Sequence, residues 1–181
     1  MENILQDIEK VLFTHEEIVE ASKRIAKQIE EDYKDKEPVL ICTLKGELPF
    51  MAELMKHIDI HVVTDFIDVS SYHGGTESTG TILIKKDVGM DIAGRDVIIV
   101  EDIVDTGRTL KALIENLLER KVASVTCASL LDKPEARIVD IEPDYIGLVC
   151  PKAFVVGFGL DYEERYRNTP YVGVLKEEIY L

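Results

Sequence analysis

Two adjacent carboxylates and a short run of hydroxyl-bearing and glycine residues are the part of this sequence best suited to chemistry. The carboxylates are Glu101 and Asp102, and the run is Asp105–Thr109, DTGRT. Hydroxyl donors, a glycine that lets the backbone approach a ligand, and a following helix N-terminus together suit a phosphate. Carboxylates repel phosphate, but they accept hydrogen bonds from sugar hydroxyls and provide the oxygen ligands that Mg²⁺ prefers. A phosphorylated ribose with Mg²⁺ therefore accounts for both groups of residues.

This stretch lies between an expected strand and an expected helix. Residues Val97–Val100 are all β-branched and apolar, which predicts a strand buried on both faces, as in a parallel sheet. From Leu110 to Leu118 the apolar residues recur at helical spacing. In open α/β sheets, ligands bind at the carboxyl ends of the strands, where this loop lies. Neither a Walker A loop nor a G-x-G-x-x-G fingerprint occurs, and a buried strand followed by a solvated acidic turn is the alternative interpretation.

The stretch from Val97 to Leu110 closely resembles the phosphoribosyl pyrophosphate (PRPP) signature of the type I phosphoribosyltransferases. Four other segments resemble the hypoxanthine-guanine branch of that family. They are Leu44-Lys45-Gly46, Ser71-Tyr72, Leu130-Leu131-Asp132-Lys133 and the run from Phe154 to Tyr162. The resemblance covers most of the chain. It implies an α/β fold with a central parallel sheet, flanking helices and a small hood formed by the two chain termini around the base.

The resemblance also implies a reaction. PRPP would combine with hypoxanthine or guanine to give IMP or GMP and pyrophosphate, a step of purine salvage. Two alternatives stay open: a sister enzyme specific for xanthine and guanine or for another base, and a regulator that keeps the fold to sense a nucleotide.

Within the central stretch, the resemblance implies a role for each polar residue. Glu101 and Asp102 should hold the ribose diol and Mg²⁺. Asp105 should interact with N7 of the purine and take part in proton transfer. The loop that should cradle the 5′-phosphate consists of Asp105, Thr106, Gly107, Arg108 and Thr109.

The pyrophosphate of PRPP should be held at a second place, the Lys45-Gly46 turn at the end of the expected strand Val39–Leu44. In the family, the matching turn often has an unusual non-proline cis peptide bond. Arg167 should provide a further pyrophosphate contact. A lysine beside a glycine is by itself weak evidence, because exposed lysines in turns are common.

A lid over PRPP is expected in the polar, glycine-rich loop 71–80, between expected strands at residues 60–70 and 81–86. Long loops of this kind are either disordered or functional. The resemblance implies that Ser71 and Tyr72 close over PRPP and exclude water.

The resemblance places the purine near residues from three parts of the chain. Lys133 should donate to the 6-oxo group, which a pure hydrogen-bond donor prefers over a 6-amino group. Phe154 should stack on the base, although a plain core role is the alternative, and the backbone of Val155 should read the base edge. Asp161 should be a Mg²⁺ ligand beside the base, and Ile103 should complete the purine site.

Length and composition set the wider limits. We expect the 181 residues to form one domain, 1–181, and the 46% hydrophobic and 31% charged content is normal for a soluble globular protein. A formal charge of −14 argues against nucleic acid and anionic membranes as partners. No signal peptide or long apolar span is found, so a cytoplasmic location is expected. We expect small-molecule substrates and a homo-oligomer, either a dimer or a tetramer.

The remaining pattern predicts the elements around the site. Thr14 and Glu17 form a capping-box pattern, which predicts a helix beginning at this point. A second helix should follow Gly46. Its expected inward residues are Leu48, Met51, Ala52 and Met55. Further strands are expected at Ala123–Leu131, Tyr145–Cys150 and Tyr171–Leu175. The three cysteines, Cys42, Cys127 and Cys150, lie in apolar runs and should be reduced core residues.

Overall fold

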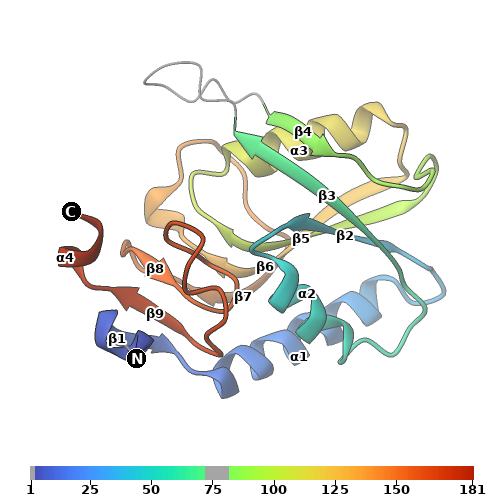
Figure 1. Ribbon diagram of the computed structural model, residues 1–181. Helices are drawn as coiled ribbons and strands as arrows, with labels where there is room; N and C mark the ends of the chain where they lie inside the picture. The colour runs from blue at the N-terminus through green and yellow to red at the C-terminus, as the bar shows by residue number, and fades with distance from the viewer. Residues whose placement is uncertain (1–2, 72–81) are drawn as a thin grey trace.

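The computed structural model describes residues 3–71 and 82–181 and is built around a six-stranded sheet (Figure 1). The strand order is β4-β3-β2-β5-β6-β7, and every neighbouring pair is parallel except β3 and β4. The strands are β2 (Val39–Leu44), β3 (Val63–Ser71), β4 (Ile82–Lys86), β5 (Asp96–Val104), β6 (Ser124–Asp132) and β7 (Tyr145–Val149). The central strand β5 is thus the one that carries the acidic pair.

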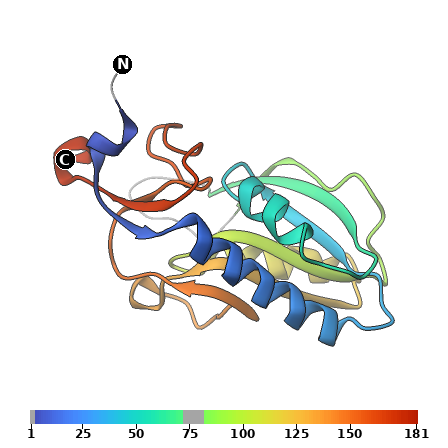
Figure 2. The same ribbon diagram turned by 90° about the horizontal axis from the view of Figure 1, so that it is seen from below.

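Helices cover both faces of this sheet, as Figures 1 and 2 show. Helices α1 (His15–Asp32) and α2 (Leu48–Met55) share one core with Leu40, Cys42, Ile98 and Val100. Helix α3 (Arg108–Glu119) shares the other core with Val39, Ile41, Val97 and Ile99. Successive strand residues therefore enter opposite cores, which is why Val39–Cys42 in β2 and Val97–Val100 in β5 are continuous apolar runs.

The start of α1 follows the predicted capping box. The Thr14 hydroxyl accepts a hydrogen bond from the Glu17 N–H at 3.3 Å, and the Glu17 carboxylate accepts one from the Thr14 N–H at 2.8 Å. The apolar stripe of this helix is buried, with Ile18, Ile25 and Ile29 fully inaccessible. The reciprocal hydrogen bonds between Thr14 and Glu17 cap the helix N-terminus, and one face of the helix is apolar. Together these two features explain why this segment is helical.

Of the four residues expected on the inward face of α2, Met51 is buried and the other three are not. Leu48 and Met55 are 50% and 38% exposed, and Ala52 is exposed, whereas Phe50, Met51 and Leu54 are buried. Glu53 is the only residue of LPFMAELM that is neither apolar nor proline. Apolar spacing alone therefore could not decide which side of the helix faces the core.

A small second sheet joins the two ends of the chain, confirming the predicted hood. It has the order β1-β9-β8, antiparallel throughout. Its strands are β1 (Ile8–Phe13), β8 (Val155–Val156) and β9 (Val172–Leu175), flanked by the short helices η1 (Ile4–Asp7) and α4 (Glu177–Tyr180). Figures 1 and 2 show both termini at this end of the molecule.

Several boundaries differ from those expected. β3 begins at Val63 instead of residue 60, β6 runs one residue further to Asp132, and a short helix η2 (Pro134–Ala136) follows it. Tyr72 and the rest of the expected lid to residue 80 lie outside the described residues, so the lid stays a prediction. Within the two described ranges, no helix is both long and apolar enough to span a membrane.

Candidate active site

The acidic pair lies within β5 instead of after it, because the strand continues to Val104. Glu101 and Asp102 are 6% and 9% exposed. The Thr43 hydroxyl on the adjacent strand β2 donates to Glu101 at 2.9 Å, and the Ile103 N–H donates to Asp102 at 2.6 Å. The pair is therefore a buried, positioned feature, which excludes the solvated acidic turn considered from sequence.

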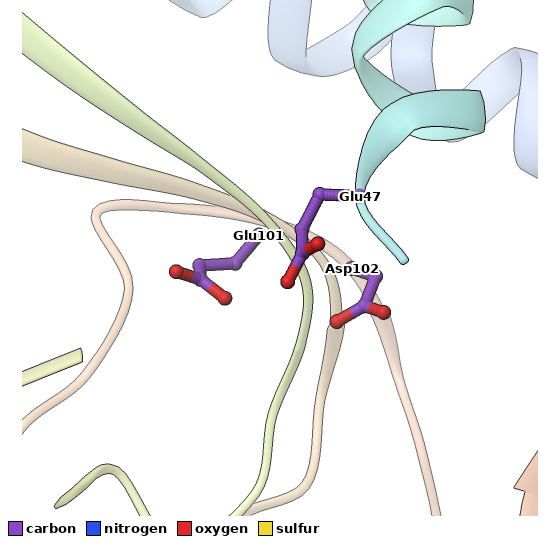
Figure 3. A group of neighbouring side chains, drawn as sticks. All are labelled: Glu47, Glu101 and Asp102. Atoms are coloured by element: carbon purple, nitrogen blue, oxygen red, sulfur yellow. The ribbon is translucent and has the colours of Figure 1, made fainter. Parts of the chain in front are cut away.

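A third carboxylate, that of Glu47, lies beside this pair (Figure 3). Glu47 is 8% exposed and directly precedes α2. One oxygen from each of Glu47, Glu101 and Asp102 lies within 4.8 Å of the other two. Glu47 was not among the residues predicted from sequence. Its place two residues beyond Lys45, at the carboxyl end of a strand next to β5, was the signal that could have found it.

The surroundings of these three groups disfavour their charged forms. Burial is the main cause that raises the pKa of each carboxyl group above its ordinary value. The negative charge of Asp102 raises the pKa of Glu47 and Glu101 further. The cluster is therefore suited to bind a cation or a proton.

The expected phosphate loop lies at the end of β5 and leads into α3. Gly107 is the N-cap of α3 and has a φ of +79°, a conformation that favours glycine. A Cβ at this position would lie 2.6 Å from the Ile141 side chain and 2.9 Å from that of Arg137. A cavity of about 100 Å³ lies here, lined by Glu101, Ile103, Val104, Asp105, Thr106, Gly107, Thr109 and Leu110. The structure thus brings most of the loop, Glu101 of the acidic pair and Ile103 to one cavity.

Arg137 holds this loop in place, a role not predicted from sequence. Its guanidinium donates to the backbone carbonyls of Asp105 at 2.9 Å and Val104 at 3.2 Å. It also donates to the Ile141 carbonyl and pairs with the Asp132 carboxylate. These acceptors are backbone carbonyls, which every residue has. No residue type in the loop therefore indicates from sequence that Arg137 binds there.

The expected purine residues lie next to the phosphate loop. Lys133 Nζ donates to the Ala153 carbonyl at 3.0 Å and lies 3.4 Å from an oxygen of Asp105. Phe154 is 39% exposed, with the Tyr180 ring stacked on it at a centroid distance of 4.6 Å. A cavity of about 400 Å³ is lined in part by Lys133, Phe154 and Tyr180. Val155, in β8, pairs with β9 of the hood. Phe154 is thus not a plain core residue.

The expected pyrophosphate residues form a third group, held by ion pairs. Lys45 lies 2.8 Å from Glu164. Arg167 lies 2.9 Å from Asp161 and 3.3 Å from Glu164. The Leu44-Lys45 peptide bond is cis, as the resemblance implied.

Close backbone approach packs this group against the acidic pair. A Cβ at Gly46 would lie 2.3 Å from the Asp102 carboxylate, and one at Gly159 would lie 1.8 Å from the Gly46 carbonyl. The Gly159 carbonyl in turn accepts a hydrogen bond from Arg167 at 2.8 Å. Two cationic side chains therefore lie beside the buried carboxylates, where an anionic ligand and a cation would meet.

Comparisons with known proteins agree with this geometry. The family model "Phosphoribosyl transferase domain" matches residues 10–163. The chain is 60% identical over 174 residues to a hypoxanthine-guanine phosphoribosyltransferase of Streptococcus pneumoniae, covering 96% of this chain and 97% of that one. It is 57% identical to one of Streptococcus pyogenes, with 97% of each chain covered. A crystal structure of a hypoxanthine phosphoribosyltransferase from Staphylococcus aureus matches with a TM-score of 0.95 and 50% identity, covering 100% of this chain and 99% of that one.

Proposed function

Because this chain belongs to the phosphoribosyltransferase family, in its hypoxanthine-guanine branch, we propose that it transfers the phosphoribosyl group of PRPP to hypoxanthine or guanine. The products are IMP or GMP and pyrophosphate. The single observation that supports this most strongly is the cavity at the end of β5, where buried Glu101 lies beside the phosphate loop Asp105–Thr109.

The ribose 5-phosphate part of PRPP fits this cavity. The loop has a glycine N-cap with a positive φ, which lets the chain turn tightly into α3 and leaves the N–H groups at the helix start as donors for a phosphate. The buried carboxylates of Glu101 and Asp102 are acceptors for the ribose hydroxyls. Arg137 keeps the loop in one conformation through its hydrogen bonds to the Val104 and Asp105 carbonyls. Such prior positioning reduces the entropy lost on reaching the reactive geometry.

The residues present also fit Mg²⁺. Glu47, Glu101 and Asp102 are buried carboxylates, and Glu47 Oε2 is a buried oxygen without a hydrogen-bond partner in the described chain. Glu101 and Asp102 would hold the ion, and the resemblance adds Asp161 as a further ligand. When bound, Mg²⁺ supplies positive charge to the pyrophosphate as it leaves.

Lys45 and Arg167 are the side chains placed to hold the pyrophosphate. Their ion-pair partners are now Glu164 and Asp161. The Lys45–Glu164 pair is largely exposed, with side chains 65% and 64% accessible, so the pair is weak and a polyphosphate can replace Glu164 at little cost. Both cations would then stabilise charge as it develops on the leaving group.

The purine base is selected by residues other than those that hold the pyrophosphate, chiefly Lys133 and Phe154. Lys133 has only donors to offer, so it favours a 6-oxo group over the amino group of adenine. Phe154 offers a partly exposed ring for stacking. Asp105 is close enough to Lys133, at 3.4 Å, for both to reach one purine, with Asp105 at N7 in proton transfer.

A base panel tests this function. The protein is incubated with PRPP and Mg²⁺ and, separately, with hypoxanthine, guanine, xanthine, adenine or uracil, and the nucleotide formed is identified. We expect IMP and GMP, and no AMP. Equal turnover of adenine would contradict the role of Lys133. XMP as the main product would indicate the xanthine-guanine enzyme, and tight nucleotide binding without any turnover would indicate a regulator.

A further inference from the structure

The three-carboxylate cluster of Glu47, Glu101 and Asp102 goes beyond the acidic pair of the PRPP signature. Figure 3 shows the Glu47 carboxylate between those of the other two residues, reaching them from the start of α2, whereas the pair lies on β5. The Glu47 side chain is therefore brought in by a separate element, at the N-terminal end of a helix. All three residues are at least nine-tenths inaccessible.

One oxygen in this cluster has no partner. The Thr43 hydroxyl donates to Glu101 and the Ile103 N–H donates to Asp102, but Glu47 Oε2 accepts from no group in residues 3–71 and 82–181. A buried carboxylate oxygen without a donor is costly, and more so when the group is charged. Such an oxygen, aimed into a cluster of like groups, indicates a ligand that is not part of the chain.

The charges around the cluster favour a cation as that ligand. In the described part of the chain, no lysine or arginine lies within 4.0 Å of these three carboxylates. Lys45 is instead paired with Glu164, and Arg167, whose positive charge partly offsets the rise in the pKa of Asp102 and Glu47, is paired with Asp161. The carboxylates of Glu47, Glu101 and Asp102 are thus left without direct ion-pair partners in the described part of the chain.

The spacing suits a single ion. The three ligand oxygens lie within 4.8 Å of one another. Around one octahedral Mg²⁺, opposite ligand oxygens are about 4.2 Å apart and adjacent ones about 3.0 Å apart, and at most one of the three pairs can be opposite. Even a pair 4.8 Å apart reaches the adjacent spacing when each side chain moves by about 0.9 Å, so small side-chain movements close the cluster around one divalent cation.

We propose that Glu47 is a third carboxylate ligand, which with Glu101 and Asp102 binds one divalent cation in the absence of PRPP. The identity of the ion as Mg²⁺ rests on the proposed function, whereas the existence of the site rests on the three side chains alone. In this chain the cation would thus be in place before the sugar phosphate arrives, instead of arriving only with it.

The test is Mn²⁺ binding to the substrate-free protein, measured from the electron paramagnetic resonance signal of free Mn²⁺ at about 0.15 M salt, where weak surface association is screened. We expect one site per chain, from which Mg²⁺ displaces Mn²⁺. Glu47→Gln should weaken binding by at least about tenfold, since even the loss of a group supporting a ligand costs 10–100-fold. Glu53→Gln is the matched control: it removes the same charge from a buried residue six positions away that pairs with Lys56 and His57.

Thermal unfolding provides a second readout. Mg²⁺ should raise the melting temperature of the wild-type protein and of Glu53→Gln, but should raise that of Glu47→Gln much less. Two results would overturn the proposal: no stoichiometric Mn²⁺ binding without PRPP, or equal Mn²⁺ affinity in wild type and Glu47→Gln. Neither Mn²⁺ binding nor thermal unfolding requires turnover. The cation site can therefore be disproved while the protein still forms IMP and GMP, and the proposed reaction can be disproved while the cation site is found.

Discussion

At the scale of single residues, the acidic groups of the site fall into two kinds. Glu101 and Asp102 are buried within β5, whereas the Asp105 side chain is 47% exposed and lies 3.4 Å from Lys133. A buried pair is suited to binding, because it is fixed and excluded from water. An accessible carboxylate next to a base-recognising lysine is suited to exchanging a proton with the substrate.

This difference predicts separate effects of substitution. Asp105→Asn should lower kcat by about 10²–10⁴-fold, the usual worth of general acid–base help, with little change in PRPP affinity. Changing Glu101 and Asp102 together to Gln and Asn should instead weaken the binding of PRPP with Mg²⁺. Steady-state kinetics and PRPP titration of both variants measure the two effects.

A helix cap is the alternative role for Asp105, and Asn would fill that role about as well as Asp. The N-cap of α3 is Gly107, and no side chain caps it. Nearly unchanged kcat in Asp105→Asn would nevertheless show that this carboxylate is not the proton-transfer group.

At the scale of elements, the phosphate loop depends on the segment that follows β6. The Arg137 side chain is 13% exposed, and it binds the loop carbonyls of Val104 and Asp105 as well as the buried Asp132 carboxylate. The Thr106 carbonyl also accepts the N–H groups of Ile138 at 3.1 Å and Val139 at 3.3 Å. The loop is thus held from a distant part of the chain.

Arg137→Ala should therefore be strongly destabilising. Removing one partner of a buried ion pair typically costs about 3–5 kcal/mol, since the remaining charge is left uncompensated. We expect a fall of this size in the free energy of unfolding, measured with urea, together with a raised KM for PRPP. Arg120→Ala is the control: it breaks a pair with Asp87, which is 53% exposed, and should cost no more than about 1 kcal/mol. Equal costs for the two variants would contradict the role of Arg137.

The elements also show what the sequence could and could not predict. Strand Val39–Leu44 was predicted at its observed bounds, because a continuous apolar run is typical of a doubly buried strand. The inward face of α2 was wrong except at Met51, because apolar residues lie on all sides of that helix. Arg137 was missed for a different reason: it acts through contacts with a segment far away in sequence, which local spacing does not encode. Glu47 had only its position after Lys45, at the end of a strand, as a signal.

At the scale of the whole molecule, side chains along the central strands point alternately to the two faces of the large sheet. One hydrophobic core lies on each face. Cys42 and Cys150 lie in the core under α1 and α2, and Cys127 lies in the core under α3. All three cysteines are free and buried, which confirms that they are core residues. Burial is the main cause that raises the pKa of Cys42 to about 12, and it also raises the pKa of the other two thiols.

The thiols of the folded protein should therefore be unreactive. The thiolate is the nucleophile, and at pH 8 a thiol with a pKa near 12 is almost entirely protonated. We expect Ellman's reagent to modify none of the three cysteines in the native protein at pH 8, and all three after unfolding in guanidinium chloride. Rapid modification of a thiol in the folded protein would show that one core opens far more readily than its burial indicates.

The organisation of the whole chain also leaves expectations that are still predictions. A single domain, a homo-oligomer of two or four copies and a cytoplasmic location are among them. The expectation that nucleic acid is not a partner is also a prediction, and it rests on the formal charge of −14. A small anionic substrate needs only the local cations Lys45 and Arg167.

The central claim is that PRPP and a 6-oxopurine react in the cavity formed by the end of β5. The most direct measurement is the amount of IMP and pyrophosphate formed for each PRPP consumed with hypoxanthine, in the wild type and in the Glu101→Gln, Asp102→Asn double variant. We expect one IMP and one pyrophosphate per PRPP in the wild type, and a greatly raised KM for PRPP in the variant. PRPP consumption without IMP, or a double variant as efficient as the wild type, would contradict the claim.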